Sequence, residues 1–410
     1  MVASEVRALF AVASRPEIVS LAGGMPNVAA LPLDQLGDLV KDVVSEEGTA
    51  ALQYGSAQGD PVLREQICDY MTLEGIQAVP DDVIVTVGSQ QALDLITRVF
   101  VDPGDIVLTE APTYVTAINT FAAFQADIRH VGMDDEGVDT DELDHALTEA
   151  AKAGRTVKFF YTIPNFQNPA GITMSAERRE RVMEVCRRHD VLIVEDNPYG
   201  LLRYDGEQKP TLYSQGDGNV IYLGSLSKTL SPGLRIGWAL APSAVRAKLV
   251  LAAESAMLSH STFNQFVVRR YLETFPWREQ IKTFNSMYTE RRDALLGALN
   301  TMMPVGCTWT RPEGGFFVWA TLPEGIDAKA MLPRAVNHRV AYVPGTGFFA
   351  DGRGRDSMRL SFCYPTPEQI REGVRRLVGA IEGEIDLRDT FGPAMATTTE
   401  GSQAPTPDLP

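Results

Sequence analysis

Residues 83–91, Val-Ile-Val-Thr-Val-Gly-Ser-Gln-Gln, decide the fold of the chain around them. Five β-branched residues in a row are typical of a buried strand. The Gly-Ser step that follows is typical of a helix start, with Ser89 as the expected N-cap. Apolar residues then continue at helical spacing through Leu93, Ile96 and Val99. A buried strand followed at once by a helix predicts an α/β unit.

The same alternation continues along the chain. Pro103-Gly104 ends the first helix, and short β-branched or aromatic runs then alternate with helical patterns. These runs predict strands over residues 106–109, 128–131, 157–162, 191–195 and 220–224. Because parallel strands need long crossovers, the pattern predicts an α/β fold with a mostly parallel central sheet flanked by helices.

The two ends of the chain have a different pattern. Helices there mix with alternating strands such as residues 315–319 and 358–362, which predicts a smaller α+β domain built from both chain ends. Residues 1–50 are expected to form an N-terminal arm and part of this small domain, 51–289 the large α/β domain, and 290–390 the C-terminal small domain. Residues 391–410 are poor in apolar side chains, which predicts a disordered tail.

Composition excludes several classes of function. With 410 residues and 44% hydrophobic residues, the chain can bury sizeable cores without disulfides or metals. A formal charge of −16 repels phosphate backbones and anionic lipids, so neither nucleic acid nor membrane is an expected partner. The four cysteines form no CxxC pair and the five histidines no ligand-spaced cluster, so no metal site is predicted. The N-terminus lacks a signal-peptide pattern, which favours a cytoplasmic protein.

Polar side chains follow three of the predicted strands at the point where each strand ends. Asn168, Asp196 and Lys228 occupy these positions. Ligands of open α/β sheets bind at the carboxyl ends of the strands, where these side chains would converge. Lys228 lies in a segment of small, hydroxyl-bearing and otherwise uncharged residues. A lysine in such surroundings loses its proton more easily and can attack a carbonyl. Arg235, seven residues later, suits a phosphate.

Five motifs in chain order resemble those of pyridoxal-phosphate-dependent aminotransferases of fold type I, class I and II. They are Gly88-Ser89-Gln90-Gln91-Ala92-Leu93, Asn168-Pro169-Ala170-Gly171, Asp196-Asn197-Pro198-Tyr199, Ser225-Leu226-Ser227-Lys228 with Arg235-Ile236-Gly237, and Arg359-Leu360-Ser361-Phe362. The opening Ser20-Leu21-Ala22-Gly23-Gly24-Met25-Pro26-Asn27 resembles the branch that contains 2-aminoadipate, kynurenine and aromatic aminotransferases. The resemblance covers about residues 16–385 and implies that residues 51–289 bind the cofactor.

The resemblance implies a role for each matching residue around pyridoxal 5'-phosphate. Lys228 would hold the cofactor as a Schiff base and move a proton as general base and acid. Asp196 would pair with the pyridine nitrogen. The resemblance thus implies three catalytic residues, Lys228, Asp196 and Tyr199. Asn168 and Tyr199 would hydrogen-bond the phenolic oxygen, and Tyr114 would stack on the ring. The phosphate would be bound by Ser89, Gln90, Ser225, Ser227 and Arg235.

The substrate residues follow from the same resemblance. Arg359 would grip the substrate carboxylate, assisted by Asn168 and the backbone of Gly24. Arg7 matches an arginine that, in some relatives, meets acidic substrate side chains. Tyr54 matches a tyrosine that reaches the phosphate of the neighbouring subunit, which implies a homodimer with shared sites.

Each of these residues also has a purely structural interpretation. Ser89 could be an N-cap and Asn168 a turn former, while Tyr114 and Tyr199 could serve packing alone. Arg359 could belong to a structural ion pair, and Arg7 could be a surface residue.

The leading functional hypothesis is an aminotransferase. It would move the amino group of an aromatic, branched-chain or 2-aminoadipate-like L-amino acid to a 2-oxo acid, with 2-oxoglutarate as the first candidate. A lyase that catalyses β-elimination or decarboxylation on the same fold is the alternative, because the fold does not dictate which bond breaks. A transcription regulator with an aminotransferase-like sensor domain is less expected, because such proteins carry a basic winged-helix domain ahead of the first motif, which begins here near Ser20.

Overall fold

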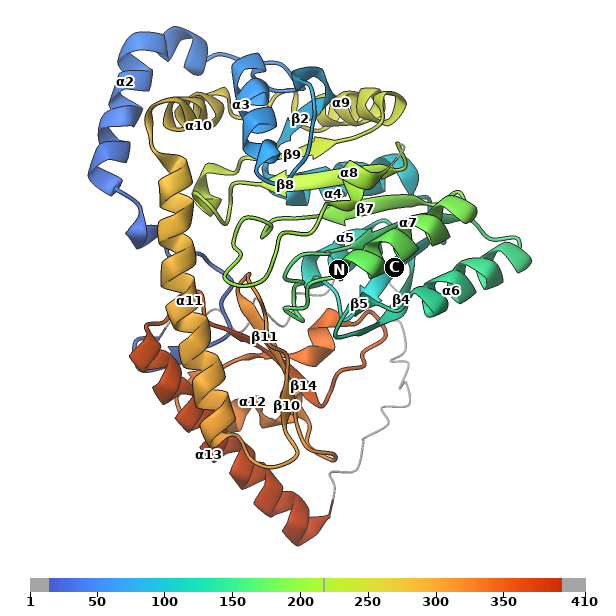
Figure 1. The fold of residues 1–410 in the computed structure, drawn as a ribbon, viewed down its shortest axis with the longest axis vertical. Helices are drawn as coiled ribbons and strands as arrows, with labels where there is room; N and C mark the ends of the chain where they lie inside the picture. The colour runs from blue at the N-terminus through green and yellow to red at the C-terminus, as the bar shows by residue number, and fades with distance from the viewer. Residues whose placement is uncertain (1–14, 217, 393–410) are drawn as a thin grey trace, which may run out of the picture.

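The computed structural model describes residues 15–216 and 218–392. Its centre is an eight-stranded sheet in the order β2-β9-β8-β7-β6-β3-β4-β5 (Figure 1). The strands are β2 (Val83–Thr86), β3 (Ile106–Ala111), β4 (Asp127–Asp134), β5 (Gly137–Val138), β6 (Val157–Thr162), β7 (Leu192–Asp196), β8 (Val220–Ser225) and β9 (Gly237–Leu240). The pairs from β4 through β3, β6 and β7 to β8 are parallel, whereas β9 and β5 pair antiparallel with their neighbours. The predicted mostly parallel sheet is confirmed.

Helices cover both faces of this sheet because its strands are apolar on both sides. One face packs against α4 (Gly88–Phe100), α5 (Val115–Ala123) and α9 (Ser243–Met257). The other face packs against α6 (Thr140–Lys152), α7 (Ala176–Arg188) and the short α8 (Leu212–Gln215). Alternate residues of a strand point to opposite faces, so Asp196 of β7 points toward the first helical layer and Glu195 toward the second.

A smaller α+β unit lies at the other end of the molecule (Figure 1). Its four-stranded antiparallel sheet has the order β10-β11-β14-β13, with β10 (Thr308–Trp309), β11 (Phe317–Thr321), β13 (Val343–Pro344) and β14 (Ser357–Ser361). Helices α12 (Ala328–Asn337) and α13 (Pro367–Phe391) complete it. The N-terminal strand β1 (Val19–Ser20) pairs in parallel with β12 (Val340–Ala341), so both ends of the chain contribute to this unit as predicted.

Four further helices surround the large sheet or connect it to the small unit. Helices α2 (Leu33–Ala51) and α10 (Thr262–Thr274) pack together at the large-sheet end, with α3 (Pro61–Thr72) beside α10. Helix α11 (Trp277–Met302) runs from there to α13 (Figure 1). The domain boundaries at residues 50, 289 and 390 stay predictions, and Phe391 is the last residue of α13. The predicted tail lies outside the described residues from position 393 onward.

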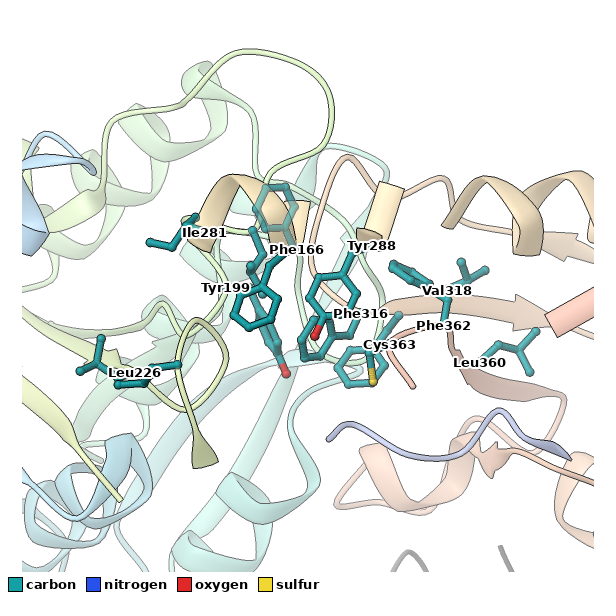
Figure 2. Close-up of a cluster of buried hydrophobic side chains, with 14 of the residues drawn as sticks. Phe166, Tyr199, Leu226, Ile281, Tyr288, Phe316, Val318, Leu360, Phe362 and Cys363 are labelled. Carbon is teal, nitrogen blue, oxygen red and sulfur yellow. The ribbon is translucent and has the colours of Figure 1, made fainter. Parts of the chain in front are cut away.

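An aromatic cluster fills the junction between the two units. The ring of Tyr288, on α11, is tilted by 59° against that of Phe316, with 4.9 Å between ring centres, and Phe316 makes an edge-on contact with Tyr199 at 5.4 Å. Figure 2 shows Tyr199 and Phe316 side by side, with Cys363 next to Phe316. The junction therefore fixes the small unit against the segment that follows β7. No helix of the described ranges 15–216 and 218–392 is long and apolar enough to cross a membrane.

Candidate active site

One pocket lies at the carboxyl edge of the large sheet, facing the small unit, and it collects most of the predicted site residues. It has a volume of about 300 Å³. The predicted residues that line it are Gly24, Ser89, Gln90, Tyr114, Asn168, Asp196, Tyr199, Ser225, Ser227, Lys228, Arg235 and Arg359. The parallel strands β6, β7 and β8 all end here, so the loops that follow them meet although they are distant in sequence.

Lys228 lies inside the pocket in the loop after β8. Its Nζ donates a hydrogen bond to the carbonyl oxygen of Gly24 at 3.0 Å and lies 5.8 Å from the ring centre of Tyr199. Burial lowers the pKa of the Lys228 ammonium from 10.5 to about 8. A larger fraction of this amine is therefore unprotonated at neutral pH than for a surface lysine, as a nucleophile requires.

Asp196, at the end of β7, is 4% exposed and receives one hydrogen bond, from the hydroxyl of Tyr161 to Oδ2 at 2.7 Å. Its other oxygen, Oδ1, is buried and has no hydrogen-bond partner among the described residues. Burial raises the pKa of the carboxyl from 3.8 to about 6, although the Tyr161 hydroxyl opposes that rise. An unpartnered buried carboxylate oxygen at a pocket wall suits a cationic ring nitrogen.

Arg359, on β14, is 5% exposed and reaches across to the large unit. Its guanidinium donates to Oδ1 of Asn168 at 2.9 Å and to the carbonyl oxygen of Ala22 at 3.0 Å. Two aromatic rings flank it, Phe317 at 4.1 Å and Phe348 at 5.1 Å from its central carbon to the ring centres. Its Nε has no partner among the described residues. Since both bonded partners are neutral oxygens, the positive charge is left for an anion.

The opposite end of the pocket is formed by the N-terminus of α4 and the loop after β8. The first-turn N–H groups of α4 have no partner within the helix and point at this end. Gly88 has φ of +70°, and a Cβ there would lie 2.5 Å from the guanidinium of Arg235. The Ser225 hydroxyl donates to that of Ser227 at 2.9 Å. Backbone donors, two hydroxyls and a guanidinium together suit a phosphate.

One sequence-based prediction for this end is wrong. Ser89 is not the N-cap, because α4 begins at Gly88 with Val87 in the cap position and no side-chain cap bond. The Val87 N–H is instead bonded to the side chain of Gln91 at 2.7 Å. The side-chain amide of Gln90 donates to the hydroxyl of Thr120 at 2.8 Å, and the role of Gln90 at the phosphate stays a prediction.

Two predicted residues are not in the pocket of this chain. Tyr54 leaves 76% of its surface exposed, between α2 and α3, and its role across a dimer stays a prediction. Arg7 lies outside the described residues. Sequence reasoning missed Tyr161, because a tyrosine inside the run Val157–Thr162 has the pattern of an ordinary buried strand residue.

The lining fits pyridoxal phosphate, because it combines an unpartnered carboxylate oxygen with an amine and a set of phosphate donors. Asp196 Oδ1 could meet the ring nitrogen, Lys228 Nζ the aldehyde carbon, and the α4 N-terminus with Arg235 the phosphate. The carboxylate of Asp196 and the guanidinium of Arg359, which each lack a partner of opposite charge in the described part of the chain, line the same pocket.

Comparisons with known proteins agree with this chemistry. Residues 18–377 match the family model for aminotransferase class I and II. The chain is 46% identical to aromatic-amino-acid aminotransferase 1 of Thermococcus litoralis, over 94% of this chain and 93% of that protein. It is 38% identical to 2-aminoadipate transaminase of Thermus thermophilus, over 94% and 95% of the two chains.

A solved structure extends the match to three dimensions. The kynurenine aminotransferase of Pyrococcus horikoshii, solved in complex with PMP, superimposes with a TM-score of 0.90 at 42% identity, covering 94% of this chain and 96% of that one. The resemblance noted in the sequence is therefore confirmed. The chain belongs to the class I and II aminotransferases of fold type I, a pyridoxal-phosphate-dependent family of enzymes.

Proposed function

We propose that this enzyme moves the amino group of an L-amino acid to a 2-oxo acid, with an aromatic, branched-chain or 2-aminoadipate-like donor and 2-oxoglutarate as acceptor. The proposal rests above all on Lys228, a lysine of lowered pKa that shares one pocket with Asp196 and Arg359. The aromatic and 2-aminoadipate donors are those of the similar enzymes from Thermococcus litoralis and Thermus thermophilus.

Lys228 would act as the amine that binds the cofactor covalently and then as the group that moves a proton at the substrate Cα. When bound, pyridoxal phosphate supplies an aldehyde and an electron-withdrawing ring. The hydrogen bond from Lys228 Nζ to the Gly24 carbonyl oxygen positions the amine at the pocket, 5.8 Å from the centre of the Tyr199 ring. A pKa of about 8 lets the same nitrogen take up and release a proton near neutral pH.

Asp196 would pair with the pyridine nitrogen and keep that nitrogen protonated. The Tyr161 hydroxyl is bonded to Oδ2, so Oδ1 would be free to pair with the ring nitrogen. Asn168 and Tyr199 would bind the phenolic oxygen, and Tyr114 would cover the ring face. Ser225, Ser227, Arg235 and the N–H groups of Ser89 and Gln90 would bind the phosphate.

Arg359 would bind the substrate carboxylate, with Asn168 and the backbone of Gly24 beside it. A buried guanidinium whose bonded partners are neutral oxygens gains a charge-assisted pair when a carboxylate arrives. Tyr54, exposed on its own chain, would complete the phosphate site of a second copy in a homodimer. Arg7 would meet an acidic side chain of the donor.

Absorbance spectroscopy tests the proposal. The purified protein with pyridoxal phosphate should show a band near ~420 nm, and L-amino acids added without an acceptor should convert it to a band near ~330 nm. Lys228→Ala should abolish the ~420 nm band, whereas Lys248→Ala, an exposed residue of α9, should keep it. Release of ammonia or carbon dioxide in place of the new band would favour the lyase, and a band that Lys228→Ala leaves intact would refute the role of Lys228.

A further inference from the structure

A short segment of the small unit crosses to the large sheet beside the pocket. It comprises the single turn η4 (Gly345–Phe348) and the next two residues, Phe349 and Ala350. Hydrogen bonds at Phe348 and Ala350 join it to the large unit. The Thr113 N–H donates to the carbonyl oxygen of Phe348 at 3.0 Å, and the Ala350 N–H donates to Nε2 of His130 at 2.7 Å. His130, on β4, is thus the side chain that holds the end of this crossing segment.

The hydrogen bonds of His130 require a neutral ring. Since Nε2 accepts from the Ala350 N–H, it carries no proton, and the ring proton resides on Nδ1. Nδ1 lies 3.1 Å from the carbonyl oxygen of Glu110 and 3.0 Å from the hydroxyl of Thr109. A second proton on the ring would place two N–H donors face to face at Ala350. The pH that adds this proton would therefore break the bond.

The surroundings of His130 favour the neutral form. Burial lowers the pKa of the ring below its ordinary 6.5, and Arg353 lowers it further, while Asp351 and the Glu110 carbonyl oppose the change. The Glu110 carboxylate is directed elsewhere, to Thr162, Ile163 and Gln167. The edge of the Phe349 ring packs on the imidazole at 5.9 Å.

The crossing segment carries Phe348 to the candidate carboxylate site. Phe348 is fully buried, with its ring centre 5.1 Å from the central carbon of the Arg359 guanidinium and 5.6 Å from the ring of Trp319. Together with Phe317 it encloses Arg359 between two aromatic rings. A segment released at Ala350 would loosen the Phe348 side of that enclosure and admit water to the guanidinium.

We infer that His130 is a positioning residue for the substrate: its neutral ring holds the crossing segment, and with it Phe348, against Arg359, so that amino acid binding weakens when the ring gains a proton. The inference rests on the proposed function, because it takes Arg359 as the carboxylate site. His130 would affect substrate binding, whereas Lys228 would carry out the proton transfer. A change at His130 should therefore alter KM and leave kcat unchanged.

Three proteins test the inference: wild type, His130→Gln and His130→Ala. The Gln side-chain oxygen can accept from the Ala350 N–H at every pH, whereas Ala cannot accept at all. As the pH falls below 6.5, KM for an amino donor should rise more steeply in the wild type than in His130→Gln, which lacks the titrating ring. In His130→Ala it should be raised about fivefold at pH 8, the effect of one neutral hydrogen bond. His145→Gln, an exposed residue of α6, should follow the wild type.

Limited proteolysis gives a readout that needs no turnover. Trypsin at pH 8 should cleave after the exposed Arg353 faster in His130→Ala than in wild type or His130→Gln, because the segment is held at one bond fewer. A wild-type KM in His130→Ala, or the same rise of KM at low pH in His130→Gln, would overturn the inference. If no amino acid converts the absorbance band in any of the proteins, the proposed function fails instead, and the proteolysis still shows whether His130 holds the segment.

Discussion

Replacing Asp196 by Asn is expected to stabilise the cofactor-free protein while it weakens cofactor binding. Burial raises the pKa of the Asp196 carboxyl from 3.8 to about 6. Each pH unit of such a rise corresponds to about 1.4 kcal/mol, so the ionised carboxylate costs the folded protein about 3 kcal/mol. The ionised carboxylate is destabilising because its Oδ1 is buried without a partner among the described residues.

An Asn side chain removes the charge and keeps the shape. Its oxygen can still accept from Tyr161, and its amide nitrogen would take the unpartnered position, which costs about 1–2 kcal/mol. The net gain in the free energy of unfolding is then about 1–2 kcal/mol at pH 8, measured by urea unfolding of cofactor-free protein at matched concentrations. Because the folded-state pKa lies above the unfolded one, the gain is full above pH 6 and shrinks as the pH falls toward 3.8.

The cost of a buried charge is what this experiment measures. Asp196→Asn should also raise the dissociation constant of pyridoxal phosphate, which separates the stability effect from the functional one. Asp38→Asn, on the exposed side of α2, is the matched control and should change the free energy of unfolding by less than about 0.5 kcal/mol. An Asp196→Asn protein that is less stable than wild type at pH 8, or whose advantage is the same at pH 4.5, would refute the reasoning.

Three further substitutions probe the pocket. Arg359→Lys should raise KM for amino donors about 10–100-fold in steady-state assays, because an ammonium cannot form the two-point pair with a carboxylate, and an unchanged KM would contradict its role. Tyr161→Phe removes a hydrogen bond to a carboxylate worth about 1.5–3 kcal/mol, so the pKa of Asp196 should rise by about 1–2 pH units. The pH below which cofactor affinity declines, followed by fluorescence titration, should move up equally. Gly88→Ala should weaken cofactor binding about tenfold, because a Cβ there meets Arg235 at 2.5 Å at a φ of +70°; Gly37→Ala, which has open space in α2, should leave binding unchanged.

The strands of the large sheet could be predicted from the sequence because parallel strands are buried on both faces. Their β-branched and aromatic runs stand out without any alternation, and β6 coincides with the predicted 157–162. The short antiparallel strand β9 was not predicted, because Gly237–Leu240 is only four residues long and begins with glycine. The packing of α2 on α10 joins segments more than 200 residues apart, and a helical pattern carries no information about its distant partner.

The site residues could be predicted for a different reason. Asn168, Asp196 and Lys228 lie where a strand ends or in the loop after it, and the order of the motifs matches a known family. What the sequence could not show is the layer behind them. Tyr161 supports Asp196 from a neighbouring strand, and a hydroxyl inside an apolar run has no pattern of its own. The Gly-Ser step predicts Ser89 in the cap position because it resembles a helix start. Instead, Gln91 accepts a hydrogen bond from the Val87 N–H, and the helix begins two residues earlier than a Ser89 cap requires.

The hydrogen bonds of residues 21–24, which follow β1, bear on how the enzyme is made in the cell. The carbonyl oxygens of Leu21 and Ala22 receive their hydrogen bonds from Ser361 and Arg359, and the Gly24 carbonyl receives its bond from Lys228. On a ribosome, the first of these segments emerges long before β14 is translated. The pocket therefore forms only after β14 has been synthesised, and a truncated chain that already contains Lys228 would still lack one of its walls. Translation order itself thus keeps the reactive amine from being enclosed in an unfinished enzyme.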